Sequence, residues 1–295
     1  MSAAQETPTP TPQGDLLSIQ KLVVEYPGRV RKRKKFRVLH EVDLRIAPGE
    51  TVGLVGESGS GKSTIGRAVL GLAPIASGEI RFDGRSIVNL KPKERRALSR
   101  DIQVVFQDPY TSLNPAMTVN DILTEPLLVT GSTRTEADAR VRDLLDQVQL
   151  PANSGNRYAK EFSGGQRQRI AIARALCRDP RLIVCDEAVS ALDLTTQARV
   201  LELFTEIRER TGVALLFITH DLDVVKHISQ RVAVMRDGRI LETGPTASVI
   251  EDPQHAYTRA LLLAAPVANP AVQAKRRTER RRFLEAQTES ITAVR

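Results

Sequence analysis

The sequence has 295 residues, of which 41% are hydrophobic, 26% are charged and none is tryptophan. This length and composition are ordinary for a globular protein with one large domain or two modest ones. The longest apolar runs, such as residues 213–218 and 261–265, are much too short to cross a bilayer, which excludes a helical membrane span.

The formal net charge is +8, and basic residues are concentrated at 28–37 and 275–282. Phe36 and Phe283 are the only aromatic residues interleaved with them, so few rings are available to stack on bases. A solvated loop and a solvated tail are the favoured interpretation, a surface beside anionic lipid headgroups is the next, and nucleic-acid binding is the last. The role of the basic segment 29–37 and of the basic tail 275–282 stays open.

The N-terminus lacks the basic and apolar regions of a secretory signal. Its Thr-Pro repeats offer little to bury, so we predict a disordered leader over residues 1–15. Cys177 and Cys185 have neither metal-ligand spacing nor a secretory context, and we expect both thiols to be reduced, buried and inert.

Alternating residues at 16–26 and 38–46 predict two strands separated by turns, and the apolar run at 51–56 predicts a third. Residues 63–72 then have helical spacing. Asp-Gly pairs later predict two hairpin turns, at Asp83-Gly84 and at Asp237-Gly238.

Residues 56–64, GESGSGKST, fit the pattern G-x-x-x-x-G-K-[ST] and lie between a predicted strand and a predicted helix, as a phosphate-binding loop requires. Lys62 can reach the β- and γ-phosphates, and the Ser63 hydroxyl can ligate Mg²⁺. A chance glycine-rich turn is the alternative, which the flanking strand and helix disfavour. The predicted nucleotide-binding residues of this loop are Gly56, Glu57, Ser58, Gly59, Ser60, Gly61, Lys62, Ser63 and Thr64.

A short apolar run at 102–106 ends at Gln107, whose amide can reach the metal or the attacking water. Residues from about 108 to 161 contain helical segments and no convincing strand, which predicts a helical insertion.

A second turn suited to an anion follows at residues 163–166. Ser163, Gly164, Gly165 and Gln166 place a hydroxyl, two glycines and an amide at the start of a predicted helix, where backbone N–H groups favour negative charge. The sequence thus contains two potential phosphate sites about a hundred residues apart.

Two buried-strand runs, 182–187 and 213–221, have polar residues at their carboxyl ends. Asp186 is placed to hold Mg²⁺, Glu187 to act as general base on water, and His220 to donate to a γ-phosphate oxygen. Paired acids at a strand end are often only solvated, and a lone histidine is more often structural. Their position downstream of a phosphate loop favours the functional interpretation.

The helix predicted between these strands, over residues 195–210, should end at Gly212. Its buried face is predicted to contain Val200, Leu203, Phe204 and Ile207. Strands that alternate with helices predict an α/β P-loop core around a mainly parallel sheet, with an antiparallel β subdomain, the helical insertion and a C-terminal helical extension.

The ordered set of phosphate loop, Gln107, SGGQ, LIVCDE, SALD and His220 resembles the ATP-binding cassette (ABC) ATPases over residues 16–243. Phe162 stands where that family usually has leucine before Ser-Gly-Gly-Gln. The resemblance implies that two ATPases pack head to tail, so that Ser163–Gln166 of each contacts the nucleotide of the other. It also assigns Asp193 to a loop that crosses between subunits and an aromatic residue, Tyr26 or alternatively Phe36, to adenine stacking.

The segment QDPYTSLNP after Gln107 resembles the importers of oligopeptides, dipeptides and nickel, and residues 244–266 resemble their C-terminal extension. Ala256 replaces the proline of the family's His-Pro-Tyr at residues 255–257. The tail has no cysteine, so no iron–sulfur cluster is expected in this chain. The long basic segment resembles the second ATPase of the dipeptide pair, and residues 244–295 are assigned to the extension and tail.

This resemblance implies an ATP-hydrolysing subunit, peripheral on the cytoplasmic face of the inner membrane. Its implied partners are two permease subunits, a second ATPase, identical or related, and an extracytoplasmic binding protein. A soluble cassette ATPase, such as an accessory protein of phosphonate breakdown, is the main alternative. A nucleic-acid or translation factor is disfavoured because such factors contain two cassettes in one chain, so no direct nucleic-acid contact is expected.

Overall fold

The computed structural model describes residues 14–28 and 35–264. The predictions for the first 13 residues, for residues 29–34 of the basic segment and for the basic tail lie outside this part of the chain. The strands are β1 (Leu17–Tyr26), β2 (Phe36–Ile46), β3 (Thr51–Val55), β4 (Ile75–Phe82), β5 (Arg85–Ser86), β6 (Ile102–Val105), β7 (Leu182–Asp186), β8 (Ala214–Thr219), β9 (Arg231–Arg236) and β10 (Arg239–Pro245). The α-helices are α1 (Lys62–Val69), α2 (Pro92–Leu98), α3 (Pro109–Ser112), α4 (Val119–Leu128), α5 (Arg134–Gln147), α6 (Gly164–Leu176), α7 (Leu194–Thr211), α8 (Leu222–Ile228), α9 (Thr246–Glu251) and α10 (Ala256–Ala264), and two 3₁₀ turns are η1 (Ala152–Asn156) and η2 (Ala159–Glu161).

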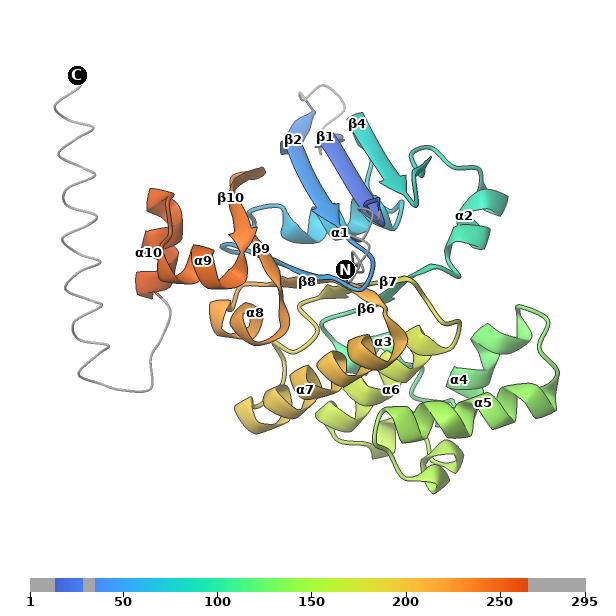
Figure 1. The fold of residues 1–295 in the computed structure, drawn as a ribbon. Helices are drawn as coiled ribbons and strands as arrows, with labels where there is room; N and C mark the ends of the chain where they lie inside the picture. The colour runs from blue at the N-terminus through green and yellow to red at the C-terminus, as the bar shows by residue number, and fades with distance from the viewer. Residues whose placement is uncertain (1–13, 29–34, 265–295) are drawn as a thin grey trace, which may run out of the picture.

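The strands form two sheets. A four-stranded antiparallel sheet has the order β2-β1-β4-β5, and a six-stranded sheet has the order β10-β9-β3-β8-β7-β6. In the larger sheet β9, β3, β8, β7 and β6 are parallel, and only β10 pairs antiparallel. The predicted α/β class with a mainly parallel sheet and an antiparallel subdomain is confirmed. Figure 1 shows α1 between the two sheets and α3 to α7 gathered beyond the larger one.

Successive residues of the central strands serve different cores because side chains alternate across a strand. Leu182 and Val184 of β7 pack with α1 and the antiparallel sheet, whereas Ile183 packs against the helices on the opposite face. β8 repeats this pattern with Leu216 on one face and Phe217 on the other. A strand that is buried on both faces reads as a continuous apolar run, which is how β7 and β8 read in the sequence.

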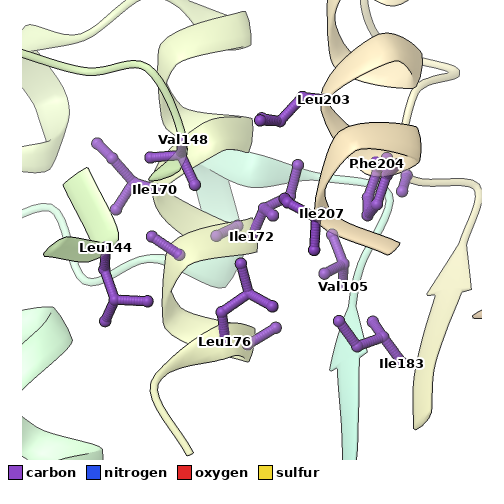
Figure 2. Packing of buried hydrophobic residues seen from close by; sticks show 14 of the residues in the cluster. Val105, Leu144, Val148, Ile170, Ile172, Leu176, Ile183, Leu203, Phe204 and Ile207 are labelled. Atoms are coloured by element: carbon purple, nitrogen blue, oxygen red, sulfur yellow. The ribbon is translucent and has the colours of Figure 1, made fainter. Parts of the chain in front are cut away.

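The helical face of the larger sheet contains the predicted apolar stripe of α7. Its four predicted core residues are fully buried, and the ring of Phe204 meets that of Phe217 edge to face at 5.6 Å between centroids and 88° between planes. Figure 2 shows Leu203, Phe204 and Ile207 beside Ile172 and Ile183. Gly212 ends the helix in the left-handed conformation, as predicted, with φ of 69°.

Both predicted hairpin turns are present. Asp83 and Gly84 have φ of 51° and 74°, and Asp237 and Gly238 have 47° and 74°, so both central residues of each turn have positive φ, as a type I′ turn requires.

Two short helices have no counterpart among the predicted elements. Helix α2 buries none of its seven residues, so the sequence has no apolar stripe there from which a helix could be predicted. Helix α8 has only seven residues, which is too short for a helical period to stand out, although the Asp221 carboxylate caps it by accepting from the Asp223 and Val224 N–H groups.

The region predicted as a helical insertion contains α3, α4, α5, η1 and η2, and its one isolated bridge pairs Thr118 with Tyr158. Cys177 and Cys185 are free and buried, as predicted, and burial raises the pKa of Cys177 to about 12, which suppresses its thiolate. Among the described helices, none combines the length and the apolar character that a membrane span needs.

Candidate nucleotide-binding site

Four neighbouring parallel strands deliver polar residues to one edge of the larger sheet. The glycine-rich loop follows β3, His220 follows β8, Asp186 and Glu187 stand at the end of β7, and Gln107 lies just beyond β6. Because the carboxyl ends of parallel strands meet at one edge, residues far apart in the sequence are brought together there. The prediction that these side chains share one sheet edge is confirmed.

The glycine-rich loop is pressed against the end of β9. A Cβ atom at Gly56 would lie 2.0 Å from the Met235 carbonyl oxygen, and one at Gly61 would lie 2.9 Å from side-chain atoms of Leu39 and Met235. Gly56 and Gly61 have φ of 154° and 106°, and the value at Gly61 is one that side chains rarely adopt. Glycine is therefore required at both positions for this compact loop.

Lys62 is only 4% exposed, and its ammonium group donates to the Gly56 carbonyl at 2.8 Å and to the Glu57 carbonyl at 2.9 Å. Burial lowers the pKa of Lys62, while the carboxylates of Glu187, Asp186 and Glu57 oppose the change. The loop thus holds a desolvated cation at its centre. Such a cation is suited to exchange carbonyl partners for phosphate oxygens.

Ser63 and Asp186 meet directly, since the Ser63 hydroxyl donates to the Asp186 carboxylate at 2.7 Å. Burial raises the pKa of Asp186, and the bond from Ser63 opposes this. A hydroxyl and a carboxylate are the hard oxygen donors that Mg²⁺ prefers, and Mg²⁺ usually takes only one or two protein ligands beside phosphates and water. This pair therefore fits the ion, although the described residues hold no cluster of three or more His, Cys, Asp or Glu side chains suited to a metal.

Glu187 and His220 form the second pair of the edge. The Glu187 carboxylate lies 3.6 Å from Nδ1 of His220, and the two side chains are 19% and 52% exposed. Glu187 has a φ of 51°, and its N–H donates to the Ile218 carbonyl at 2.9 Å, which ties the left-handed residue to β8. Strain at a non-glycine residue is common where function dictates a side chain's direction.

Gln107 is exposed at the outer end of the same edge, after β6. It is two strands away from β8 and three from β3, so it lies farther along the edge from Lys62 than Asp186 does. Its contact with a metal or with water stays a prediction.

The predicted second anion turn is a helix start. The Ser163 hydroxyl accepts from the Gln166 N–H at 3.4 Å, and the Gln166 amide oxygen accepts from the Ser163 N–H at 3.1 Å, a reciprocal capping box. Gly165 brings α6 close to α7, because a Cβ there would lie 2.2 Å from Cγ2 of Thr196. The turn therefore has a structural role within the chain, whatever it binds outside it.

Asp193 is exposed and begins α7, where its carboxylate accepts from the Thr196 N–H at 3.0 Å. Hydrogen bonds from Thr196 lower the pKa of Asp193.

Of the two aromatic candidates for adenine, Tyr26 is half-buried against the core and Phe36 is 68% exposed, and the two are cross-strand partners. An exposed ring is free to stack on a base, and a half-buried one serves packing as well.

Sequence reasoning missed the contacts that hold the glycine-rich loop from outside. The Gly238 N–H, in the β9–β10 turn, donates to the Ser60 carbonyl at 2.9 Å, and the Tyr257 hydroxyl accepts from the Glu57 N–H at 3.2 Å. The hairpin turn and the C-terminal segment were both visible in the sequence, but no local pattern indicated that either reaches the loop.

The sequence of this chain is similar to those of ABC transporter proteins. A family model described as ABC transporter matches residues 39–190. The chain is 49% identical over 267 residues to the glutathione import ATP-binding protein GsiA of Escherichia coli K12, and the match covers 89% of this chain and 43% of that protein. The corresponding protein of Pectobacterium atrosepticum is 49% identical over 261 residues, covering 87% of this chain and 42% of that protein.

A Brucella ovis protein named for peptide import and ATP binding is also 49% identical, over 262 residues that cover 88% of this chain and 82% of that protein. The chain thus spans less than half the length of the glutathione-named relatives and most of the peptide-named one.

Solved structures show the same fold. The cbiO1 protein of Clostridium perfringens, part of the ABC transporter complex cbiONQ, superposes with a TM-score of 0.73 at 26% identity, covering 84% of this chain and 95% of that one. A cassette solved as a dimer in a post-hydrolysis state with ADP and Pi has a TM-score of 0.69 at 27% identity, covering 78% and 98%.

Proposed function

This chain belongs to the ABC transporter family, and we propose that it is the ATP-hydrolysing subunit of a complex that imports peptides or a similar small solute. The observation that carries the proposal is the shared sheet edge, where Lys62, the Ser63–Asp186 pair and the Glu187–His220 pair converge. In the catalytic unit we include residues 16–243, with the insertion at about 108–161, and we treat residues 244–295 as an appended extension and tail.

Each residue of the edge has a proposed role in hydrolysis. Lys62 and the backbone N–H groups of residues 56–64 bind the phosphates, and Ser63, Asp186 and Gln107 hold Mg²⁺, which when bound neutralises phosphate charge. Glu187 accepts a proton from the attacking water, and His220 holds the γ-phosphate and the carboxylate in one arrangement. The position of Tyr26 or Phe36 near the start of the fold supports adenine stacking by one of them.

Ser163–Gln166 and Asp193 are proposed to act across a dimer. The first turn of an α-helix leaves backbone N–H groups without intrahelical partners, and the positive end of the helix dipole favours an anion there. The capping box orients this turn, and a second ATPase subunit would bring its bound nucleotide to it. The dimeric state of the similar cassette with ADP and Pi supports this arrangement.

The membrane partners are proposed to dock beside Gln107. Phe106 is 41% exposed and Tyr110 57% exposed, on either side of that residue, and aromatic side chains are enriched at protein interfaces. A contact there would link the nucleotide edge to two permease subunits and place the chain at the cytoplasmic face of the membrane. The names of the relatives support import over a soluble accessory ATPase, and equal identity to glutathione- and peptide-named relatives leaves both solute classes within the proposal.

Uptake in a strain that lacks the encoding gene tests the proposal. We expect loss of uptake of labelled dipeptides, tripeptides or glutathione, restored by the wild-type gene and not by a Glu187→Gln gene expressed to the same level. If the deletion strain imports all of these solutes at the wild-type rate, the proposal is wrong for this solute class.

A further inference from the structure

The glycine-rich loop is held by two elements that lie after the catalytic residues in the sequence. The β9–β10 turn binds the Ser60 carbonyl through Gly238, and α10 reaches the start of the loop through Tyr257. Helix α10 belongs to the C-terminal extension, and no residue of this extension has a role in the proposed hydrolysis. Figure 1 shows α9 and α10 side by side, next to β9 and β10.

Tyr257 is a buried residue with its hydroxyl at the loop. It is 6% exposed and packs with Val55, Val234 and Val249, and Val55 is the last residue of β3 before the loop. The Arg236 guanidinium lies over its ring at 4.9 Å from the centroid. Burial raises the pKa of Tyr257, so the phenol stays neutral and accepts the Glu57 N–H as a hydroxyl.

The start of α10 is fixed by its own hydrogen bonds. The Glu242 carboxylate, on β10, accepts from the N–H groups of Gln254 and His255 at 2.8 and 3.1 Å. The ring nitrogen Nδ1 of His255 then accepts from the Tyr257 N–H at 3.0 Å. These hydrogen bonds fix the position of the first turn of α10 relative to β10, and they thereby hold Tyr257 where its hydroxyl contacts the loop.

The peptide group between Gly56 and Glu57 joins Tyr257 to Lys62. Its N–H, on Glu57, donates to the Tyr257 hydroxyl at 3.2 Å, and its carbonyl, on Gly56, accepts from the Lys62 ammonium at 2.8 Å. Hydrogen bonds that share one peptide polarise each other, and a peptide held at its N–H end has less freedom to turn its carbonyl. Both ends of this peptide are therefore fixed before a phosphate arrives.

We propose that Tyr257 is a positioning residue of the nucleotide site, which preorganises the phosphate loop by holding the Gly56–Glu57 peptide from the C-terminal extension. The inference rests on the proposed function, because it assumes that Lys62 and its loop bind ATP. Without the hydroxyl the loop must lose more conformational freedom when ATP binds, so affinity falls while the chemistry at Glu187 is unchanged.

The test is Tyr257→Phe, which removes the hydroxyl and keeps the ring. Calorimetric titration of the purified full chain with Mg-ATP measures the dissociation constant. We expect Kd to rise about three- to tenfold, which is the effect of losing one neutral hydrogen bond. In ATPase assays the KM should rise by a similar factor while kcat changes less than about twofold.

Two matched variants separate positioning from stability. Leu261→Ala removes an apolar side chain that packs in the same small core, and it should lower Tm without weakening Mg-ATP binding. Tyr158→Phe removes a hydroxyl from a tyrosine that is 43% exposed and lies in the insertion, and it should leave both quantities unchanged. Wild-type affinity in Tyr257→Phe, or an equal loss in Leu261→Ala, would overturn the inference. A wild-type chain that binds no Mg-ATP would instead overturn the proposed function.

Discussion

Lys62 and Asp186 show how burial and pairing act on single groups at the nucleotide edge. Burial shifts both groups toward their neutral forms, lowering the pKa of Lys62 and raising that of Asp186. The Ser63 hydroxyl and the two loop carbonyls compensate part of this cost. The charged forms of Lys62 and Asp186 therefore lower the stability of the nucleotide-free chain. They lie where bound phosphate and Mg²⁺ would interact with them.

This cost predicts a pH-dependent gain in stability for Asp186→Asn. A raised pKa in the folded state means that the carboxyl contributes stability at low pH, which is lost as the pH rises through the folded-state pKa. The nucleotide-free Asn variant should therefore unfold at a higher temperature than the wild type at pH 7, by about 2 °C, and the difference should shrink toward pH 4. Scanning calorimetry across this range measures it, and the control is Asp193→Asn, which should show no gain in Tm at pH 7 because the pKa of Asp193 is lowered in the folded chain.

A lower Tm for Asp186→Asn at pH 7 would mean that the charge stabilises the empty site through Lys62. The same variant should lose most of its ATPase activity, since its amide replaces the carboxylate proposed to hold Mg²⁺.

At the scale of elements, the meeting of α6 and α7 determines where the SGGQ turn points. Ser163 caps α6 and Asp193 caps α7, and each accepts a backbone N–H three residues further on. The two helix starts touch at Gly165 and Thr196. The requirement for glycine at the second position of the helix thus has a packing reason that is independent of any ligand.

Gly165→Ala should therefore destabilise the chain, although alanine usually favours a helix over glycine. Its Cβ would lie 2.2 Å from Cγ2 of Thr196, and forced overpacking of this kind costs about 1–3 kcal/mol. Gly164→Ala is the matched control, since its nearest contact would be an ordinary 3.6 Å. Thermal unfolding of both variants, and of Gly165→Ala combined with Thr196→Ala, measures the effect.

The double variant should recover most of the lost stability, because it removes the methyl group that clashes. No recovery would indicate that the new Cβ is accommodated by a shift of backbone and not by the Thr196 side chain.

For the whole molecule, the residues proposed to contact the nucleotide lie on two separate sets of elements. Lys62, Asp186, Glu187 and His220 are all delivered by adjacent strands β3, β8 and β7. Ser163–Gln166 is at the start of a helix that packs on α3, α4, α5 and α7. We propose that ATP binds between two such chains and that hydrolysis removes the γ-phosphate that joins them, a two-state closure.

Glu187→Gln is expected to trap the closed dimer. The amide cannot accept the proton from water, so turnover should fall by about 10²- to 10⁴-fold, the usual contribution of a general base, while ATP stays bound. Light scattering during size-exclusion chromatography with Mg-ATP should show a dimer of this chain, or a heterodimer once the related ATPase is added. Lys62→Ala in the same background should abolish the dimer, because it removes the main phosphate contact. A chain that stays monomeric with both partners and nucleotide present would contradict the shared-site proposal.

Local patterns in the sequence were enough to predict most elements of the fold. The buried runs of β7 and β8, the apolar stripe of α7 and the two Asp-Gly turns depend on neighbouring residues and on spacings of two or about four, so a single stretch reveals each of them. The phosphate loop and the residues at the strand ends are equally local, and the rule that parallel strands meet at one edge brought them together.

Contacts between distant segments were decided only in three dimensions. The Glu57–Tyr257 bond joins residues 200 positions apart, the Ser63–Asp186 bond spans 123 positions, and Gly165 meets Thr196 across two helices. The short helices α2 and α8 were also not predicted. Helix α2 buries no residue, and α8 is too short for apolar residues to show a helical period. Periodicity records which face of an element is buried but not which element covers it, and for that reason the packing of the C-terminal extension on the phosphate loop emerged only from the folded chain.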